Sequence, residues 1–333
     1  MQNSEVTNTN ISNEELTKAC EIINNLQKYY KERIVGQESL GISLIISLMT
    51  NNHLLIESVP GLAKTTAAKI IINAVNGKFS RIQCTPDLLP SDIIGGQIFN
   101  YANSKFDTKL GPVFANFVLL DEINRSSAKT QSAMLEAMQE RAVSIGGTTY
   151  KLENVFVVIA TQNPIEQEGT YTLAEAQVDR FLLKEKLTYP SVTEEVTILN
   201  RLEKDIILNN PPLYDLNAVL FLQGITKKVY VDDKIKNYIA TIIDATRNPS
   251  KYIDDSLAKL VTMGASPRGS IAFMEASKAI AIINGRSYVN PNDVKMVAYK
   301  VLRHRITLSF QALASNISSE KIIEAIMKAI PTP

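Results

Sequence analysis

Short apolar runs alternate with segments of helical periodicity over the first part of the chain. Helical spacing is clearest in 64–75 and 127–140, and two further helices are expected near 14–30 and 39–49. Five runs have the length and composition of buried strands: residues 54–56, 79–84, 117–120, 155–160 and 181–187. Continuous apolar strands separated by helices are typical of a parallel sheet covered on both faces. The pattern therefore predicts an α/β unit with a five-stranded parallel sheet.

Two segments interrupt this alternation, at about 95–112 and 141–152. The first contains Gly-Gly, Asn-Ser and Gly-Pro turn signals, and the second places Gly146-Gly147 between two strand-like runs. Such turn residues between short strands predict hairpins inserted into the sheet scaffold. The aromatic side chains of Tyr101, Phe106 and Tyr150 either contact another protein or pack against their own hairpins.

Beyond Tyr189-Pro190 the pattern predicts helices alone. Apolar residues follow helical spacing from Ile235 to Ile243, with Asp232 or Asp233 as the N-cap, and again after Pro291, with Asn292 as the cap candidate. We therefore expect a flexible tail over 1–13, an α/β unit over 14–189 and a smaller helical domain over 190–333.

Composition narrows the cellular setting. The 333 residues include 35 Lys and Arg against 34 Asp and Glu, and this near-neutral balance argues against a strongly basic nucleic-acid binder. Only Cys20 and Cys84 are present, with no disulfide framework. Met1–Asn13 lacks the features of a secretory signal, and no apolar run approaches the roughly 18 residues that span a bilayer. We expect a cytoplasmic protein without direct membrane insertion.

The loop from Ser58 to Thr65 lies between an apolar strand and a helix, which is the placement of a phosphate-binding loop. Backbone N–H groups at the helix start favour an anion, Lys64 has the length to reach phosphates, and the Thr65 hydroxyl suits Mg²⁺. The strict glycine pattern is interrupted by Ser58 and Ala63. Taken alone, the loop is also compatible with an ordinary turn before a helix.

Acidic and amide side chains follow two other strands. Asp121 and Glu122 come directly after the apolar run 117–120, and Asn163 follows the fourth run. Ligands bind at the carboxyl ends of the strands in open α/β sheets. One acid can bind Mg²⁺ through water and the next can polarise an attacking water, whereas in isolation such acids often only cap a strand or helix.

Together these motifs resemble a MoxR-family AAA+ ATPase. They occur in family order over nearly the whole chain, and they occupy residues 35–38, 59–65, 120–125, 160–171, 175–181, 264–269 and 301–306. Ala63 is typical of this family's loop. Ser58 departs from the usual Gly, and Thr172 and Ala174 replace prolines often seen there. Because Gly reaches positive φ more cheaply than Ser, Ser58 raises the question of a weakened nucleotide site.

The resemblance implies an AAA+ P-loop NTPase core, an all-α lid, ATP and Mg²⁺ as cofactors, and roles for individual residues. Asp121 and Glu122 match Walker B, with Asp121 and Thr65 as the Mg²⁺ ligands. Asn163 matches sensor 1. Arg180 matches the arginine finger, which reaches the neighbouring subunit's nucleotide, and Arg268 matches sensor 2 on the lid. The implied Walker A set is Val59, Pro60, Gly61, Leu62, Ala63, Lys64, Thr65 and Thr66.

Taken alone, Arg180 is better explained by a surface ion pair to Asp179, and Arg268 by a charge in a loop at a helix start; only the full motif set favours the functional roles. The hairpin at 95–112 resembles the helix-2 insert, and the one at 141–152 resembles the hairpin before sensor 1. The resemblance also implies a homo-oligomeric ring, expected to be a hexamer.

MoxR-like proteins are thought to act as chaperones in maturation or cofactor insertion of client complexes, often with a von Willebrand factor A domain partner. The leading hypothesis is thus an ATP-hydrolysing remodelling protein. The alternative is a nucleotide-gated scaffold with little hydrolysis. An NTPase that acts on DNA or RNA is disfavoured by the neutral composition and the absence of an aromatic-basic stripe.

Overall fold

A computed structural model describes residues 11–102, 104–164, 171–203 and 211–333. These residues form two compact units. The sheet unit comprises residues 26–219, and the helical unit comprises the described residues up to Asn25 together with 220–333. Most of the expected tail, 1–13, lies outside the described residues. The expected boundary at 189/190 stays a prediction.

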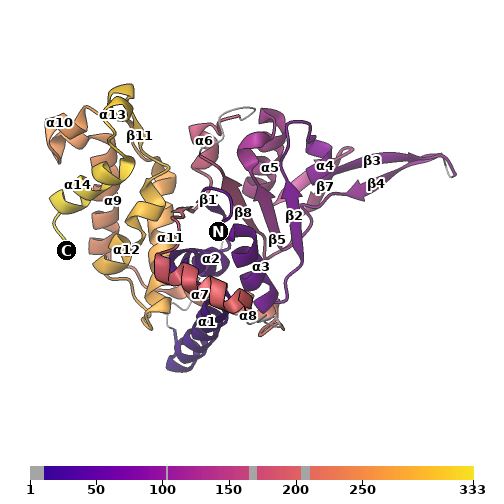
Figure 1. Ribbon diagram of the computed structural model, residues 1–333, viewed down its shortest axis with the longest axis horizontal. Helices are drawn as coiled ribbons and strands as arrows, with labels where there is room; N and C mark the ends of the chain where they lie inside the picture. The colour runs from indigo at the N-terminus through magenta and orange to yellow at the C-terminus, as the bar shows by residue number, and fades with distance from the viewer. Residues whose placement is uncertain (1–10, 103, 165–170, 204–210) are drawn as a thin grey trace, which may run out of the picture. The chain divides into compact units, whose positions relative to one another are not determined.

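The sheet unit is built on five parallel strands in the order β2–β5–β8–β1–β9. Strands β2, β5, β8 and β1 are labelled in Figure 1. Their bounds are β1 (Leu54–Glu57), β2 (Phe79–Gln83), β5 (Phe117–Asp121), β8 (Val157–Gln162) and β9 (Leu183–Lys186). Each matches an expected apolar run within a few residues, so the predicted five-stranded parallel sheet is confirmed. All residues of β5 are buried, as expected for an inner strand covered on both faces.

Helices cover the sheet because successive strand residues point to opposite faces. Val118 and Leu120 of β5 join the same apolar cluster as Met134, Leu135 and Met138 of helix α5. Helices α2 and α3 pack against β1 and β5. The helices of this unit are α1 (Asn13–Arg33, shared with the helical unit), α2 (Glu38–Thr50), α3 (Lys64–Ala74), α4 (Pro90–Ile94), η1 (Ile123–Arg125), α5 (Ala128–Glu140), α6 (Glu175–Val178), α7 (Val192–Glu203) and α8 (Leu216–Lys228), which continues into the helical unit.

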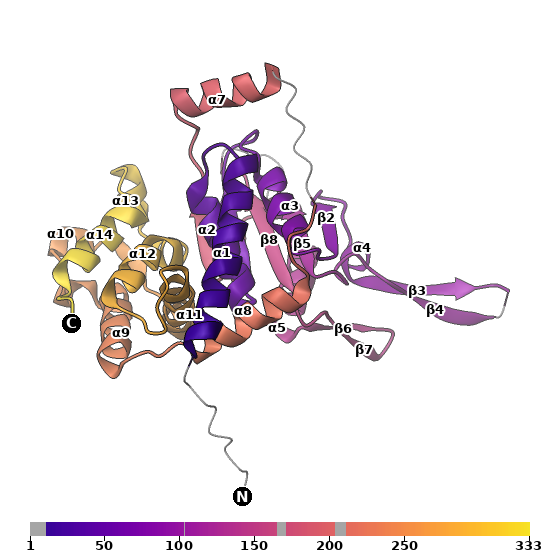
Figure 2. The same ribbon diagram turned by 90° about the horizontal axis from the view of Figure 1, so that it is seen from below.

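Both expected hairpins are present in the sheet unit (Figure 2). Strand β3 (Gly95–Asn100) pairs with β4 (Lys105–Leu110), and β6 (Ala142–Ile145) pairs with β7 (Thr148–Lys151), each antiparallel. Gly146 and Gly147 adopt φ values of +58° and +82° at the second turn, which explains the Gly-Gly sequence there.

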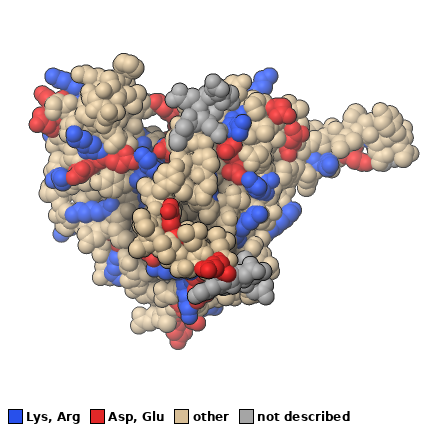
Figure 3. All heavy atoms as spheres, in the orientation of Figure 1, with Lys and Arg blue, Asp and Glu red and all other residues tan. Residues whose placement is uncertain are grey.

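The aromatic residues of these hairpins differ in environment. Tyr150 is half-buried, and its hydroxyl donates to Thr108 Oγ1 at 3.3 Å, so it packs against the other hairpin. Tyr101 and Phe106 are 88% and 64% exposed, although both rings meet Phe99 edge-on. In Figure 3 this projecting hairpin carries few charges, whereas basic and acidic side chains are interspersed over the rest of the visible face. Contact of Tyr101 and Phe106 with a client protein stays a prediction.

The helical unit holds the expected helices and also a short antiparallel ribbon that the sequence analysis did not predict. The ribbon pairs β10 (Val261–Met263) with β11 (Thr307–Leu308). The helices are α9 (Asp233–Arg247), η2 (Pro249–Lys251), α10 (Asp255–Ala258), α11 (Pro267–Ile283), α12 (Pro291–Leu302), α13 (Phe310–Ala314) and α14 (Ser319–Ala329). Across the described parts of the chain, no helix combines the length and apolar character needed to cross a membrane.

The helix caps of this unit confirm one prediction and correct another. The Asp232 side chain accepts a hydrogen bond from the first turn of α9, as expected. Asn292 is not the cap of α12, so that prediction was wrong. Asn290 is the cap: its Oδ1 accepts from Asp293 N at 3.1 Å, and its N–H donates to Asp293 Oδ2 at 2.8 Å. The reason is that Pro291 takes the first helical position, so the cap must precede it.

Candidate functional site

The loop between β1 and α3 lies at the carboxyl end of the parallel sheet. Ser58 N donates to Gln162 O of the neighbouring strand at 3.1 Å, which ties the start of the loop to β8. Lys64, the first residue of α3, is buried and its Nζ donates to Ser58 O at 3.3 Å. The lysine thus folds back over the loop that it follows.

The backbone conformation of the loop shows whether Ser58 occupies a position that favours glycine. The residues with positive φ in this loop are Gly61 at +84° and Ala63 at +54°. Ser58 is not among them, so a serine at this position adds no left-handed strain. Ala63 does occupy the left-handed region, where a residue with Cβ costs roughly 1–2 kcal/mol.

Asp121, at the end of β5, is the most heavily hydrogen-bonded acid of the site. Its Oδ2 lies 3.4 Å from Thr65 Oγ1 and accepts hydrogen bonds from Arg81 Nε at 3.1 Å and Nη2 at 2.6 Å. Its Oδ1 accepts from Thr161 Oγ1 at 2.9 Å. Thr65 and Asp121, which are far apart in sequence, therefore meet at the strand edge as expected.

Glu122 has a left-handed backbone, with φ +58° and ψ +54°. Its N–H donates to Thr161 Oγ1 at 2.8 Å, so one hydroxyl joins both acids. Glu122 Oε2 accepts from Arg125 Nη1 at 3.1 Å and from Gln83 Nε2 at 3.3 Å. Strained backbone of this kind in a non-glycine residue persists where the surrounding contacts hold it, often at functional sites.

A cavity of about 320 Å³ lies beside the loop, and apolar side chains form much of its wall. Three segments of the sheet unit line it: Arg33, Ile34, Val35 and Gln37; Gly61, Leu62, Ala63 and Thr66; and Pro190, Ile198, Arg201 and Leu202. A cavity of this size suits a small-molecule ligand. Because a helix N-terminus favours an anion, the position of the cavity next to the start of α3 suits a ligand with one apolar part and one anionic part.

Comparisons with known proteins agree with this arrangement. Residues 53–183 match the family described as "ATPase family associated with various cellular activities (AAA)", and residues 256–326 match the AAA lid domain. The chain is 45% identical over 307 residues to "Chaperone MoxR1" of Mycobacterium tuberculosis, covering 91% of this chain and 80% of that protein. The chain belongs to the MoxR family of AAA+ ATPases.

Two further proteins are similar to this chain over 96% of its length. YeaC of Bacillus subtilis, a protein without an assigned function, is 42% identical over 320 residues, covering 96% of this chain and 95% of its own. A solved structure from Cytophaga hutchinsonii, whose ATPase assignment is itself provisional, has a TM-score of 0.89 at 43% identity and covers 96% of this chain and 97% of its own. The α/β core with a helical lid is therefore the fold of this MoxR-family chain.

Of the other residues implied by the family, Asn163 is buried directly after β8, next in sequence to the strand that carries Thr161. Arg180 lies between α6 and β9, and no hydrogen-bond partner of its buried Nε occurs among the described residues. Arg268 belongs to the helical unit, where its N–H donates to Ser266 Oγ at the start of α11. The expected roles of these three side chains stay predictions. Of the motif 160–171, residues 165–170 lie outside the described part of the chain.

Sequence reasoning missed three side chains of the site: Arg81, Gln83 and Thr161. For Arg81 and Gln83, the sequence offered only their spacing, which places both side chains on one face of a strand because residues i and i+2 share a face. Their relevance depends on β2 lying beside β5, with Gln83 opposite Asp121, which spacing along one strand does not reveal. Thr161 lies inside a motif already recognised, yet only the geometry shows its two contacts.

Cys84 and His53 are both buried, and burial shifts the pKa of each away from its usual value. Burial raises the pKa of the Cys84 thiol to about 12, so it stays protonated and unreactive. Burial, with a smaller effect of Arg141, lowers the pKa of His53 to about 3. Its Nδ1 accepts from Val158 N at 3.0 Å, and its Nε2 lies 3.3 Å from Met138 O. His53 is therefore a neutral packing residue at the start of β1.

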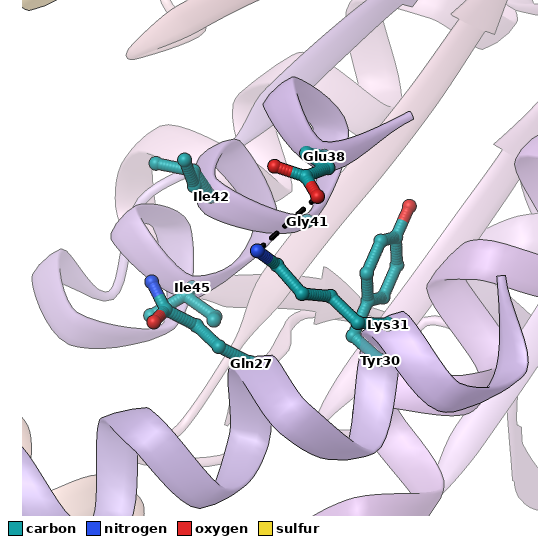
Figure 4. Close-up of a pocket in the computed structure, with 7 residues that line it drawn as sticks. All are labelled: Gln27, Tyr30, Lys31, Glu38, Gly41, Ile42 and Ile45. Atoms are coloured by element: carbon teal, nitrogen blue, oxygen red, sulfur yellow. Dashed lines mark ion pairs between the residues drawn. The ribbon is translucent and has the colours of Figure 1, made fainter. Parts of the chain in front are cut away.

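A second, smaller pocket lies between α1 and α2 (Figure 4). It has a volume of about 60 Å³ and is lined by Gln27, Tyr30, Lys31, Glu38, Gly41, Ile42 and Ile45. An exposed ion pair of 3.2 Å between Lys31 Nζ and Glu38 Oε1 crosses it. This volume holds only a few waters, and the pocket shares no residue with the site at the strand edge.

Proposed function

We propose that this MoxR-family protein binds ATP with Mg²⁺ and hydrolyses it to remodel a client protein complex. The observation that carries the proposal is the approach of Thr65 Oγ1 to Asp121 Oδ2, 3.4 Å apart, beside the buried Lys64. A hydroxyl, a carboxylate and a lysine at the start of a helix are the groups that hold a metal-bound triphosphate in P-loop NTPases.

The donor set fits Mg²⁺. Thr65 and Asp121 supply two hard oxygen ligands, and Mg²⁺ is commonly bound by one or two protein oxygens together with waters and substrate phosphates. The described part of the chain contains no cluster of three or more His, Cys, Asp or Glu residues able to hold a metal by itself. When bound, Mg²⁺ would neutralise charge on the β- and γ-phosphates.

Nucleotide would extend from the loop into the 320 Å³ cavity. The base would lie among the apolar walls that include Val35, Leu62 and Leu202. The phosphates would be held by the backbone of the loop and by Lys64, whose ammonium exchanges its contact with Ser58 O for phosphate oxygens.

Hydrolysis would use the acid that follows the metal ligand. Glu122 orients and polarises the attacking water, and Asn163 positions it from the adjacent strand end. Arg180 of a neighbouring copy would stabilise charge on the transferred phosphoryl group, and Arg268 would contact the phosphates from the lid. Such shared sites make hydrolysis depend on ring assembly.

The family assignment supports a chaperone role, and "Chaperone MoxR1" carries that word in its name. By resemblance we propose a hexameric ring in the cytoplasm that matures, or inserts cofactors into, a client complex together with a partner bearing a von Willebrand factor A domain. The exposed aromatic side chains of the β3–β4 hairpin would contact the client. Hydrolysis would move that hairpin because loss of a γ-phosphate contact can bias a two-state element.

Steady-state phosphate release from the wild type and from Glu122→Gln tests the proposal. We expect the variant to lose about 10²-fold or more of its turnover while still binding ATP, because only the water-activating carboxylate is removed. Glu136→Gln is the matched control, since Glu136 is exposed on α5 and is not among the site residues. Equal turnover in wild type and Glu122→Gln would refute the catalytic assignment.

The same assay separates hydrolysis from the alternative, a scaffold that binds ATP with little turnover. The engagement of Glu122 Oε2 by both Arg125 and Gln83 favours that alternative for the isolated chain. Specific activity that rises with protein concentration, and that Arg180→Ala abolishes, would reject the scaffold in favour of a site completed by a neighbour. Tight ATP binding with negligible turnover at every concentration would support the scaffold.

A further inference from the structure

Asp121 is the carboxylate assigned to Mg²⁺, and Arg81 makes the shortest of its side-chain hydrogen bonds. Its Nη2 and Nε donate to Asp121 Oδ2 at 2.6 Å and 3.1 Å. The guanidinium therefore grips one carboxylate oxygen with two charge-assisted hydrogen bonds. This is the oxygen that Thr65 Oγ1 approaches to 3.4 Å.

The two partners differ in exposure. The Arg81 side chain is 47% exposed, whereas that of Asp121 is 10% exposed and is held through Oδ1 by Thr161. Nη2 of Arg81 also donates to Gln83 Oε1 at 3.2 Å, which orients the guanidinium along the edge of β2. The Arg81 side chain therefore has access to water, whereas Asp121 is buried and held through Oδ1.

A guanidinium and a divalent cation compete for the lone pairs of Asp121 Oδ2. Mg²⁺ held by Thr65 and Asp121 needs a free lone pair on the oxygen that faces Thr65, and the two hydrogen bonds from Arg81 converge on it. Two cations a few ångströms apart also repel each other. Mg²⁺ and Arg81 therefore compete for one position.

We propose that Arg81 is an electrostatic latch on the metal carboxylate, a positioning residue that holds Asp121 when no Mg²⁺–nucleotide is bound and must leave when it binds. The latch rests on the proposed function, because it needs Thr65 and Asp121 to be the Mg²⁺ ligands. Because Mg²⁺ must displace Arg81, Mg²⁺ increases the affinity for nucleotide less than it would without this ion pair. The release of Arg81 on binding would also free a guanidinium on β2, next to Gln83, which contacts Glu122.

Binding of a fluorescent ADP analogue, measured in Mg²⁺ and again in EDTA, tests the latch without any hydrolysis. The readout is the ratio of the dissociation constant in EDTA to that in Mg²⁺. We expect Arg81→Gln to raise this ratio by about fivefold, the factor that corresponds to the upper range for a partly exposed ion pair. Arg81→Lys should raise this ratio less than Arg81→Gln, because lysine keeps the positive charge and loses only the paired hydrogen bonds from Nε and Nη2.

Arg125→Gln is the matched control. It removes an equal charge from a side chain that is 42% exposed and paired with Glu122 instead of Asp121. We expect its ratio to equal that of the wild type. An unchanged or lowered ratio in Arg81→Gln would overturn the latch, and so would an equal rise in Arg125→Gln, because the effect would then be general electrostatics.

A second measurement keeps the latch testable apart from the proposed function. Mn²⁺ is titrated into the nucleotide-free protein and followed by electron paramagnetic resonance, with circular dichroism to show that each variant folds. Arg81→Gln should bind Mn²⁺ more tightly than the wild type, again by about fivefold. Equal Mn²⁺ affinity would overturn the latch. Failure of the wild type to bind nucleotide in the first assay would instead overturn the proposed function.

Discussion

The substitution Thr161→Val removes the hydroxyl that is hydrogen-bonded to both Asp121 and Glu122. Thr161 is fully buried, and its Oγ1 donates to Asp121 Oδ1 at 2.9 Å and accepts from Glu122 N at 2.8 Å. Valine has nearly the same shape, so the change removes two hydrogen bonds and leaves the packing intact. It also leaves the Glu122 N–H without its acceptor.

The expected loss follows from these two contacts. A hydrogen bond to a charged group contributes about 1.5–3 kcal/mol, and an orphaned buried donor costs about 1–3 kcal/mol. Because the two share one hydroxyl and are not additive, we expect a decrease of about 2–4 kcal/mol in the opening free energy of the sheet. This corresponds to a roughly 30- to 900-fold loss of amide protection in β5 and β8.

Hydrogen exchange with peptide-resolved mass spectrometry is the suitable assay, because it reports β5 and β8 separately from the helical unit. Thr161→Ser is the control: it keeps both hydrogen bonds and deletes one methyl group, for a loss of about 1 kcal/mol. Protection in Thr161→Val equal to that of Thr161→Ser would show that the hydroxyl does not hold the two acids.

Two further changes test the packing around the site and in the lid. His53→Gln should make stability depend less on pH under acidic conditions. The pKa of His53 is about 3 in the folded protein and 6.5 for the free side chain, so protonation favours the unfolded state. The wild type therefore loses stability as pH falls below 6.5, by about 1.6 kcal/mol between pH 6.5 and about pH 5. Opening free energies of β1 and β8 at the two pH values measure this, and equal slopes in wild type and variant would contradict it. Gly264→Ala should destabilise the helical unit by about 1–3 kcal/mol, because its Cβ would clash with the backbone oxygen of Thr246. Amide exchange in α9 measures this loss, and Gly224→Ala, whose Cβ meets nothing within 4 Å, is the control; equal protection in the two variants would disprove the steric argument.

The sequence by itself determined which segments form strands and helices, and which polar residues stand at the ends of the strands. A short apolar run followed by a loop and Lys64-Thr65, and another followed by Asp121-Glu122, each specify a strand end with its polar residues. Because parallel strands present their carboxyl ends at one edge, the meeting of Thr65 and Asp121 could be expected without coordinates. The strands, the two hairpins and the main helices follow from the same periodicity.

Only the tertiary structure decided which distant side chains complete the site. The strand order placed Arg81 of β2 and Thr161 of β8 on either side of Asp121, and strand order depends on how layers pack, which periodicity along the chain does not encode. Likewise, the residues up to Asn25 join the helical unit because packing brings together segments far apart in sequence. Local patterns determine what each segment is, whereas burial of its faces against others determines what it touches.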